Sequence, residues 1–235
     1  MLVKNLALSI LLLTTNAFSM SLTAHSWLVA DGDGKIIQSE KEQEQRSIAS
    51  ITKIMTAMVI IDAGQNPKQM IGNFTREQHI QLALVTSSNE SAIALCNNYP
   101  GGKPKCIKDM NAKAIALNMP NTKFVEASGL SPMNISTALD LLKLVFEASH
   151  YPEIIRASQT PVLNIRIGNK VLSYRNTNPA IGQRYNFIVS KTGSTNAAGS
   201  CIVMMVDTDI GRRIVILLGA KAGKRLPEAE YIVYN

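Results

Sequence analysis

Ser50 and Lys53, in the segment Ser50-Ile51-Thr52-Lys53, are the first residues whose types and spacing could carry out chemistry. Positions i and i+3 lie on one face of a helix, so the lysine amine can reach the serine hydroxyl. A lysine in apolar surroundings holds its proton less tightly and can act as a neutral base. A serine nucleophile needs such a base where histidine is absent. The spacing also arises by chance in a chain of this length, so the pair alone does not establish a site.

Two further triplets carry polar groups that could act together with Ser50 and Lys53. Ser87-Ser88-Asn89 follows an apolar helical stretch and supplies a second hydroxyl and an amide. Lys191-Thr192-Gly193 lies on an expected strand, where the lysine and threonine can hold a carboxylate and the glycine lets a substrate backbone approach. Each triplet could equally be an ordinary loop or strand end. In this order and these settings, the three motifs together predict one catalytic site.

The nucleophile has to be positioned by the segment 48–63, which is apolar nearly all round and ends at Gly64 and Pro67. Its length favours a helix over a strand, and its composition predicts that the helix is buried in the core. Ser50 then lies at the helix start, where backbone N–H groups stabilise a developing negative charge.

The remaining elements form an α+β pattern. Residues 26–30 and 35–38 are typical of a β-hairpin around the turn 31–34. Strands at both ends with helices between them suggest that this hairpin joins the late strands in one antiparallel sheet. We expect helices at about 75–98, 107–118 and 137–148 (N-cap Ser136 or Thr137), strands at 162–172, 187–189, 201–206 and 213–218, and a closing helix from 227.

Composition narrows the class of protein. The chain has 235 residues, 46% hydrophobic and 17% charged, which describes one ordinary folded domain or two small ones. The net charge of +7 comes without a Lys/Arg block and with few aromatic residues among the charges, which argues against nucleic acid as a partner. An acidic polymer of the cell envelope is a better partner, although a generally basic surface explains the charge as well. Its histidines are scattered, and we expect neither a metal nor a cofactor.

The N-terminus resembles an export signal. Lys4 supplies a positive charge, Leu6 to Leu13 form a short apolar run, and Ala17-Phe18-Ser19 offers small residues for cleavage. The alternative is a membrane anchor, but the apolar run falls far short of the ~20 residues that span a bilayer. We therefore expect a cleaved signal over residues 1–19 and a soluble domain over residues 20–235, secreted to the periplasm.

Export makes the cysteines informative, because disulfides persist in oxidising compartments. Cys96 and Cys106 flank the turn Pro100-Gly101-Gly102, which could fold two neighbouring segments together. A disulfide and two buried free thiols are both open. Cys201 lies in a strand-like run and is expected to be a small core residue.

The motifs together resemble the low-molecular-mass penicillin-binding proteins, and most closely their D-alanyl-D-alanine endopeptidase branch. The similarity covers nearly all of the chain after the expected signal. It implies a β-lactamase or penicillin-binding-protein transpeptidase-like fold, in which helices flank an antiparallel sheet and form a mostly helical subdomain. The segments that carry it are Arg46 to Met58, Tyr99-Pro100-Gly101-Gly102, Ser128-Gly129-Leu130, Arg175-Asn176-Thr177-Asn178 and Lys191 to Gly199.

The resemblance implies a role for each candidate residue. Ser50 would attack the carbonyl of a D-amino-acid peptide bond and Lys53 would take its proton. Ser87 would relay a proton to the leaving amine, and Asn89 would bind the substrate and orient Lys53. Lys191, Thr192 and Gly193 would position the substrate on the strand. The backbone N–H groups of Ser50 and Ser194 would form the oxyanion hole.

The chain also departs from the family. Ser50 and Ser87 are closer in sequence than is usual, so we expect a loop or hairpin of the family to be missing around residues 65–73. The residue after Gly193 is usually aromatic in close relatives but is Ser194 here, which keeps the backbone donor and loses the ring. The chain ends soon after the late strands, without the second β-domain and amphipathic anchor of the carboxypeptidase branch, which favours the endopeptidase type.

The sequence therefore predicts a serine D,D-peptidase that cuts cross-links in peptidoglycan, takes its peptide stems as substrate, and is acylated by β-lactam antibiotics. A D-alanyl-D-alanine carboxypeptidase is the nearest alternative. A β-lactamase is less favoured, because no ExxLN stretch lies between Asn89 and Lys191. An inactive relative that only binds peptidoglycan is disfavoured by the complete set of site residues.

Overall fold

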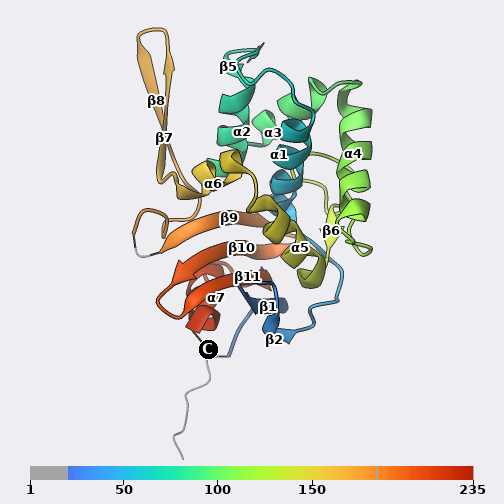
Figure 1. Ribbon diagram of the computed structural model, residues 1–235, viewed down its shortest axis with the longest axis vertical. Coiled ribbons are helices and arrows are strands. Elements are labelled where there is room, and N and C mark those ends of the chain that lie inside the picture. The colour runs from blue at the N-terminus through green and yellow to red at the C-terminus, as the bar shows by residue number, and fades with distance from the viewer. Residues whose placement is uncertain (1–20, 184, 235) are drawn as a thin grey trace, which may run out of the picture.

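A five-stranded antiparallel sheet forms one half of the molecule in the computed structural model, which describes residues 21–183 and 185–234. The strand order is β2-β1-β11-β10-β9, so the N-terminal hairpin pairs with the last strand of the late meander, as expected (Figure 1). The strands are β1 (Ser26–Asp31), β2 (Ile36–Glu40), β9 (Asn186–Thr195), β10 (Gly199–Thr208) and β11 (Gly211–Ala220).

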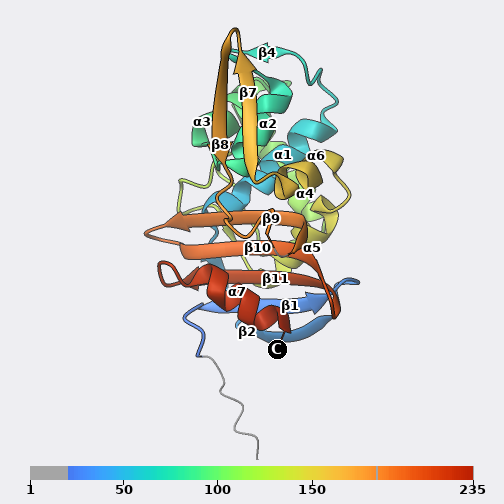
Figure 2. The ribbon, with the colours of Figure 1, turned by 90° about the vertical axis from the view of Figure 1, so that its left-hand side faces the viewer.

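The sheet is covered on both faces, which explains the near-continuous apolar runs of its central strands. On one face, α7 (Arg225–Tyr234) packs over alternate residues such as Ile202, Met204 and Val215 (Figure 2). Their neighbours, including Val203 and Ile216, face the larger core that the other helices share. The core therefore lies between the sheet and the helical half of the molecule.

The helical half is built around α1 (Thr52–Asp62), which follows a short 3₁₀ turn, η1 (Ala49–Ile51). Residues 52–60 of α1 are all buried, which confirms the prediction of a helix enclosed in the core. The other helices are α2 (Arg76–Val85), α3 (Asn89–Asn97), α4 (Gly102–Ala116), α5 (Ala138–Ala148) and α6 (Pro152–Gln159). Thr137 caps α5 by accepting a hydrogen bond from the N–H of Asp140, as the sequence suggested.

The expected helix over 75–98 is wrong as a single element. It breaks between Val85 and Asn89 into α2 and α3, because Ser87 adopts a left-handed backbone conformation (φ 61°) and Ser88 caps the second helix through its hydroxyl. The helix expected from residue 107 already begins at Gly102, since a proline in the first turn costs no helical hydrogen bond. No sequence pattern predicted α6.

Within the part of the chain that the structure describes, three small two-stranded sheets lie outside the main one. The segment 162–172, expected to be one strand, is part of a hairpin of β7 (Val162–Ile167) and β8 (Lys170–Arg175), which stands beside the helices (Figure 2). The region where we expected a missing loop contains the short pair β4 (Met70–Ile71) and β5 (Phe74–Thr75). The third pair is β3 (Arg46–Ser47) with β6 (Ile135–Ser136).

Cys96 and Cys106 form a disulfide that ties the end of α3 to α4, which settles the alternative left open by the sequence. Cys201 is a free, buried thiol on β10, as predicted. The predicted export signal, residues 1–19, lies outside the described residues. No helix in the described ranges has both the length and the apolar character to cross a bilayer.

Candidate active site

Ser50 and Lys53 meet at the junction of η1 and α1. The Lys53 side chain is fully buried, and its Nζ lies 2.8 Å from Ser50 Oγ. Ala49, directly before the serine, adopts a left-handed conformation (φ 46°), so the backbone turns sharply at the start of the helix. The contact predicted from the i, i+3 spacing is therefore present.

Lys53 Nζ has two further partners, which fix its position. It donates to Asn89 Oδ1 at 2.8 Å, from the first residue of α3, and to the carbonyl oxygen of Ser128. Burial lowers the pKa of Lys53 to about 8, although the carboxylates of Glu126 and Glu90 partly oppose that shift. A lysine with this pKa is partly neutral near physiological pH and can take a proton from Ser50.

Ser87 and Lys191 form a second pair beside the first. Lys191 Nζ donates to Ser87 Oγ at 2.9 Å and to the carbonyl oxygen of Thr192 at 2.8 Å. The Lys191 side chain is buried, and this burial holds its pKa well below the usual range, with the positive charges of Lys53 and Arg225 acting in the same direction. The turn between α2 and α3 thus carries Ser87 to strand β9, although the two lie far apart in sequence.

Strand β9 forms the edge of the main sheet and runs past the nucleophile. A Cβ atom on Gly193 would lie 3.0 Å from the backbone nitrogen of Ser50 and 3.1 Å from the carbonyl oxygen of Ile48, so only glycine fits this approach without a shift. Thr192 Oγ1 donates to Thr177 Oγ1 at 2.7 Å. Ser194 is exposed, one residue beyond Gly193. The strand is therefore placed to pair with an extended peptide next to Ser50.

Glu126, which no sequence motif singled out, organises the loop that holds the Ser128 carbonyl. Its carboxylate accepts hydrogen bonds from the N–H groups of Ser128 (2.7 Å) and Gly129 (2.6 Å) and from Asn134 Nδ2 (2.8 Å). The Ser128-Gly129-Leu130 motif marked the segment, but its contact with Lys53 depends on a loop fold that no local pattern indicates.

Arg225, at the start of α7, was also missed. Its guanidinium donates to the carbonyl oxygen of Gly193 at 3.1 Å and lies in a cavity of about 500 Å³ that Thr192, Ser194 and Thr177 also line. No signal in the sequence placed the last helix near the site. The cavity adjoins the candidate strand and adds positive charge to it.

All eight candidate residues therefore gather at one place, where the start of α1, the α2–α3 turn and strand β9 meet. A hydroxyl in contact with a buried lysine of lowered pKa is the arrangement of an activated serine nucleophile. Among the residues that the structure describes, no group of three or more His, Cys, Asp or Glu side chains could hold a metal ion. The chemistry that these side chains support is acyl transfer through serine.

Two solved penicillin-binding proteins are among the structures that share this fold. Penicillin-binding protein D2 from Listeria monocytogenes, in its ampicillin-bound form, superposes with a TM-score of 0.83 at 25% identity, covering 92% of this chain and 98% of that one. Penicillin-binding protein 6B from Escherichia coli gives a TM-score of 0.81 at 24% identity, covering 92% and 78%. The α+β fold expected from the sequence, a sheet flanked by helices with a helical subdomain, is confirmed.

The sequence comparisons identify the family. The family model described as D-alanyl-D-alanine carboxypeptidase matches residues 13–71 and 66–222. A D-alanyl-D-alanine endopeptidase from Pseudomonas aeruginosa is 41% identical, over 84% of this chain and 71% of its own length. Another from Escherichia coli is 38% identical, over 81% and 69%. The chain belongs to the D-alanyl-D-alanine carboxypeptidase family of serine peptidases.

Proposed function

We propose that this protein is a serine D,D-endopeptidase that hydrolyses D-alanine-containing cross-links in peptidoglycan. The observation that carries the proposal is the contact of Lys53 Nζ with both Ser50 Oγ and Asn89 Oδ1, beside the pair Lys191–Ser87. The choice of the endopeptidase reaction is supported by relatives that bear this name, including a third, from Haemophilus influenzae, at 30% identity.

The reaction would proceed through an acyl-enzyme. Neutral Lys53 takes the proton as Ser50 Oγ attacks the carbonyl of the D-alanyl peptide bond, and the backbone N–H groups of Ser50 and Ser194 bind the oxyanion. The C–N bond then breaks, and the leaving amine receives a proton through Ser87. Water attacks the resulting ester, which releases the peptide acid and restores the serine. No cofactor enters any step.

Lys191 and Thr192 are proposed to bind the substrate while it lies along β9. The extended stem peptide would add to the edge of the sheet, with Gly193 allowing its backbone to come close to Ser50. The Lys191 amino group and the Thr192 hydroxyl suit a carboxylate where the substrate carries one, because the negative charge of the substrate would favour the protonated lysine. A β-lactam antibiotic presents both a strained amide and a carboxylate, so we expect it to acylate Ser50.

The expected context is the periplasm, with residues 1–19 as a cleaved signal and residues 20–235 as the catalytic domain. The substrate would be the peptide stems of peptidoglycan, and no nucleic acid or stable membrane anchor is expected. The disulfide between Cys96 and Cys106 supports an oxidising compartment.

Digestion of purified cross-linked muropeptides tests the proposal, with the Ser50→Ala variant as the matched control. We expect the wild-type protein to convert dimers to monomers and the variant to leave them intact. Release of terminal D-alanine from dimers that stay intact would instead establish the carboxypeptidase. That second candidate is favoured by Arg225, which lines the same cavity as Thr192 and whose guanidinium could hold a free carboxylate.

A further inference from the structure

The partners of Lys53 decide where the lone pair of its neutral amine points. Its Nζ contacts Ser50 Oγ and Asn89 Oδ1, each at 2.8 Å, and the carbonyl oxygen of Ser128. An ammonium has three N–H groups and donates to all of these oxygens. A neutral amine keeps two N–H groups and one lone pair, and neither an amide oxygen nor a carbonyl oxygen can donate to that lone pair. The lone pair therefore points to the hydroxyl of Ser50, from which it takes the proton.

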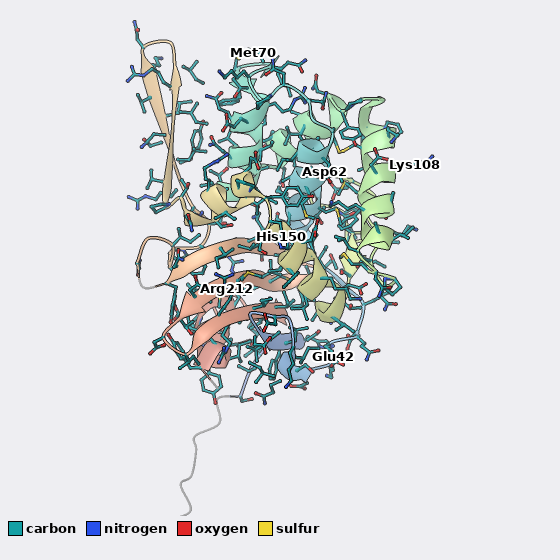
Figure 3. All side chains as sticks on the ribbon, viewed as in Figure 1. Glu42, Asp62, Met70, Lys108, His150 and Arg212 are labelled. Atoms are coloured by element: carbon teal, nitrogen blue, oxygen red, sulfur yellow. A yellow bond between two sulfur atoms is a disulfide. The ribbon has the colours of Figure 1, made fainter. Side chains whose placement is uncertain are left out.

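This direction depends on a carbonyl group that lies in a loop. Lys53 lies in the first turn of α1, at the end nearer to the sheet, and α1 runs from there to Asp62, which is labelled in Figure 3. Residues 124–134, which include Ser128, form neither helix nor strand. No regular backbone ladder fixes the Ser128 carbonyl, so its position must come from other groups.

The carboxylate of Glu126 holds this carbonyl in place. Its Oε2 accepts hydrogen bonds from the N–H of Ser128 at 2.7 Å and from the Ser128 hydroxyl at 2.5 Å, and its Oε1 accepts from the N–H of Gly129 at 2.6 Å. The N–H of Gly129 and the carbonyl of Ser128 belong to one planar trans peptide unit, in which they point in opposite directions. Glu126 on one side of this unit therefore turns the carbonyl toward Lys53 on the other.

Asn134 ties the same carboxylate to α1. Its Nδ2 donates to Glu126 Oε1 at 2.8 Å and to Thr52 Oγ1 at 3.1 Å. Asn134 and Thr52 are both fully buried, and Thr52 directly precedes Lys53. The loop, the carboxylate and the helix that carries the base are thus joined in one buried network.

Glu126 also acts on Lys53 through its charge, and Glu90 acts through its charge alone. Burial lowers the pKa of Lys53 to about 8, and both carboxylates oppose that shift. The other charged group that faces Lys53 is Lys191, on β9. Glu90 is exposed on α3, accepts a hydrogen bond from Ser88 Oγ at 3.1 Å, and makes no hydrogen bond to the loop within the described residues. It is therefore a matched reference for the charge of Glu126.

We propose that Glu126 is a positioning residue of the acylation reaction. It holds the Ser128 carbonyl where this oxygen directs the neutral amine of Lys53 toward the nucleophile. The proton passes from Ser50 Oγ to Lys53 Nζ as the bond from Oγ to the substrate carbonyl carbon forms, and the carbonyl oxygen takes the negative charge. Glu126 exchanges no proton and acts through the loop. The inference rests on the proposed function, since it requires Ser50 as nucleophile and Lys53 as base.

Stopped-flow acylation by a fluorescent penicillin, measured from about pH 6 to about pH 10, tests this role. A concentration series separates the dissociation constant of the non-covalent complex from the acylation rate constant. In Glu126→Gln the amide has only one accepting oxygen, so the plateau rate constant should fall about tenfold or more. The rising limb should move to lower pH, because the variant has lost a negative charge near Lys53, and the dissociation constant should change by less than about twofold.

Two further variants separate position from charge. Glu90→Gln should move the limb in the same direction and leave the plateau unchanged. Glu126→Asp keeps the charge on a shorter side chain, so it should lower the plateau and leave the limb in place. If Glu126→Gln does not fold, the comparison of Glu126→Asp with Glu90→Gln decides.

The outcomes distinguish this role from the proposed function itself. Wild-type plateaus in both Glu126 variants, an unmoved limb in Glu126→Gln, or a slower reaction explained by weaker penicillin binding would overturn the inference and leave the proposed function intact. A wild-type protein that penicillin does not acylate would overturn the proposed function, and this inference with it.

Discussion

The rate of acylation by penicillin should rise with pH, because Lys53 must be neutral to take the proton of Ser50. With the pKa of Lys53 at about 8, about 1% of the protein has the neutral base at about pH 6 and about half has it at about pH 8. The second-order rate constant should therefore rise about 50-fold over this range and level off above it. An unshifted lysine would give a rate that continues to rise tenfold per unit to about pH 10.

The Glu90→Gln variant sharpens this test. Glu90 is exposed, and its carboxylate raises the pKa of Lys53, so its removal should move the rising limb to lower pH and speed acylation at about pH 6. Stopped-flow measurements with a chromogenic or fluorescent penicillin give the rate at each pH for both proteins. A rate independent of pH, or a limb that moves to higher pH in the variant, would show that Lys53 is not the base.

Three further outcomes concern stability. Gly129→Ala should lower the free energy of unfolding by about 3 kcal/mol or more, since its Cβ would lie 1.9 Å from the carbonyl oxygen of Ala49. Gly72→Ala, also at positive φ but with open space around it, should lower it by about 1 kcal/mol in the same thermal unfolding measurement. Equal losses in the two variants would refute the close approach of Gly129 to Ala49. Replacing Cys96 and Cys106 by alanine should cost about 2 to 3 kcal/mol more under oxidising conditions than after reduction of both proteins, because reduction removes only the cross-link. Between about pH 8 and 10.5, the free energy of unfolding of the wild-type protein should rise by up to about 3 kcal/mol relative to that of Lys53→Met. The reason is that in this range the unfolded chain binds a proton that the folded chain has lost. Parallel pH dependences of the two stabilities would contradict the lowered pKa of Lys53.

Much of the fold follows from local patterns. The apolar run of residues 48–63 predicts the buried helix α1, and alternating turn signals predict the hairpin and the meander that join in one sheet. The break of α2 from α3 was missed because it depends on Ser87 holding a left-handed conformation, which tertiary contact with Lys191 stabilises. The helix α6 has only eight residues, too short for its periodicity to stand out.

The motifs of the candidate site could be predicted from the sequence, but the way they are arranged in space could not. The spacing of Ser50 and Lys53 is local, so their contact could be inferred from helix geometry. The partners Glu126 and Arg225 lie on a loop and a distant helix, and only the folded chain brings them to Lys53 and Gly193. Pairing of the cysteines was left open for the same reason, since it requires α3 and α4 to pack side by side.

The central claim is that Ser50 is the residue that forms the acyl-enzyme. Mass spectrometry after incubation with penicillin tests it most directly, by locating the adduct on a proteolytic peptide. The account predicts one penicilloyl group, on Ser50, and none on the Ser50→Ala protein. An unlabelled wild-type protein, or an adduct that persists on another residue when Ser50 is replaced, would contradict it.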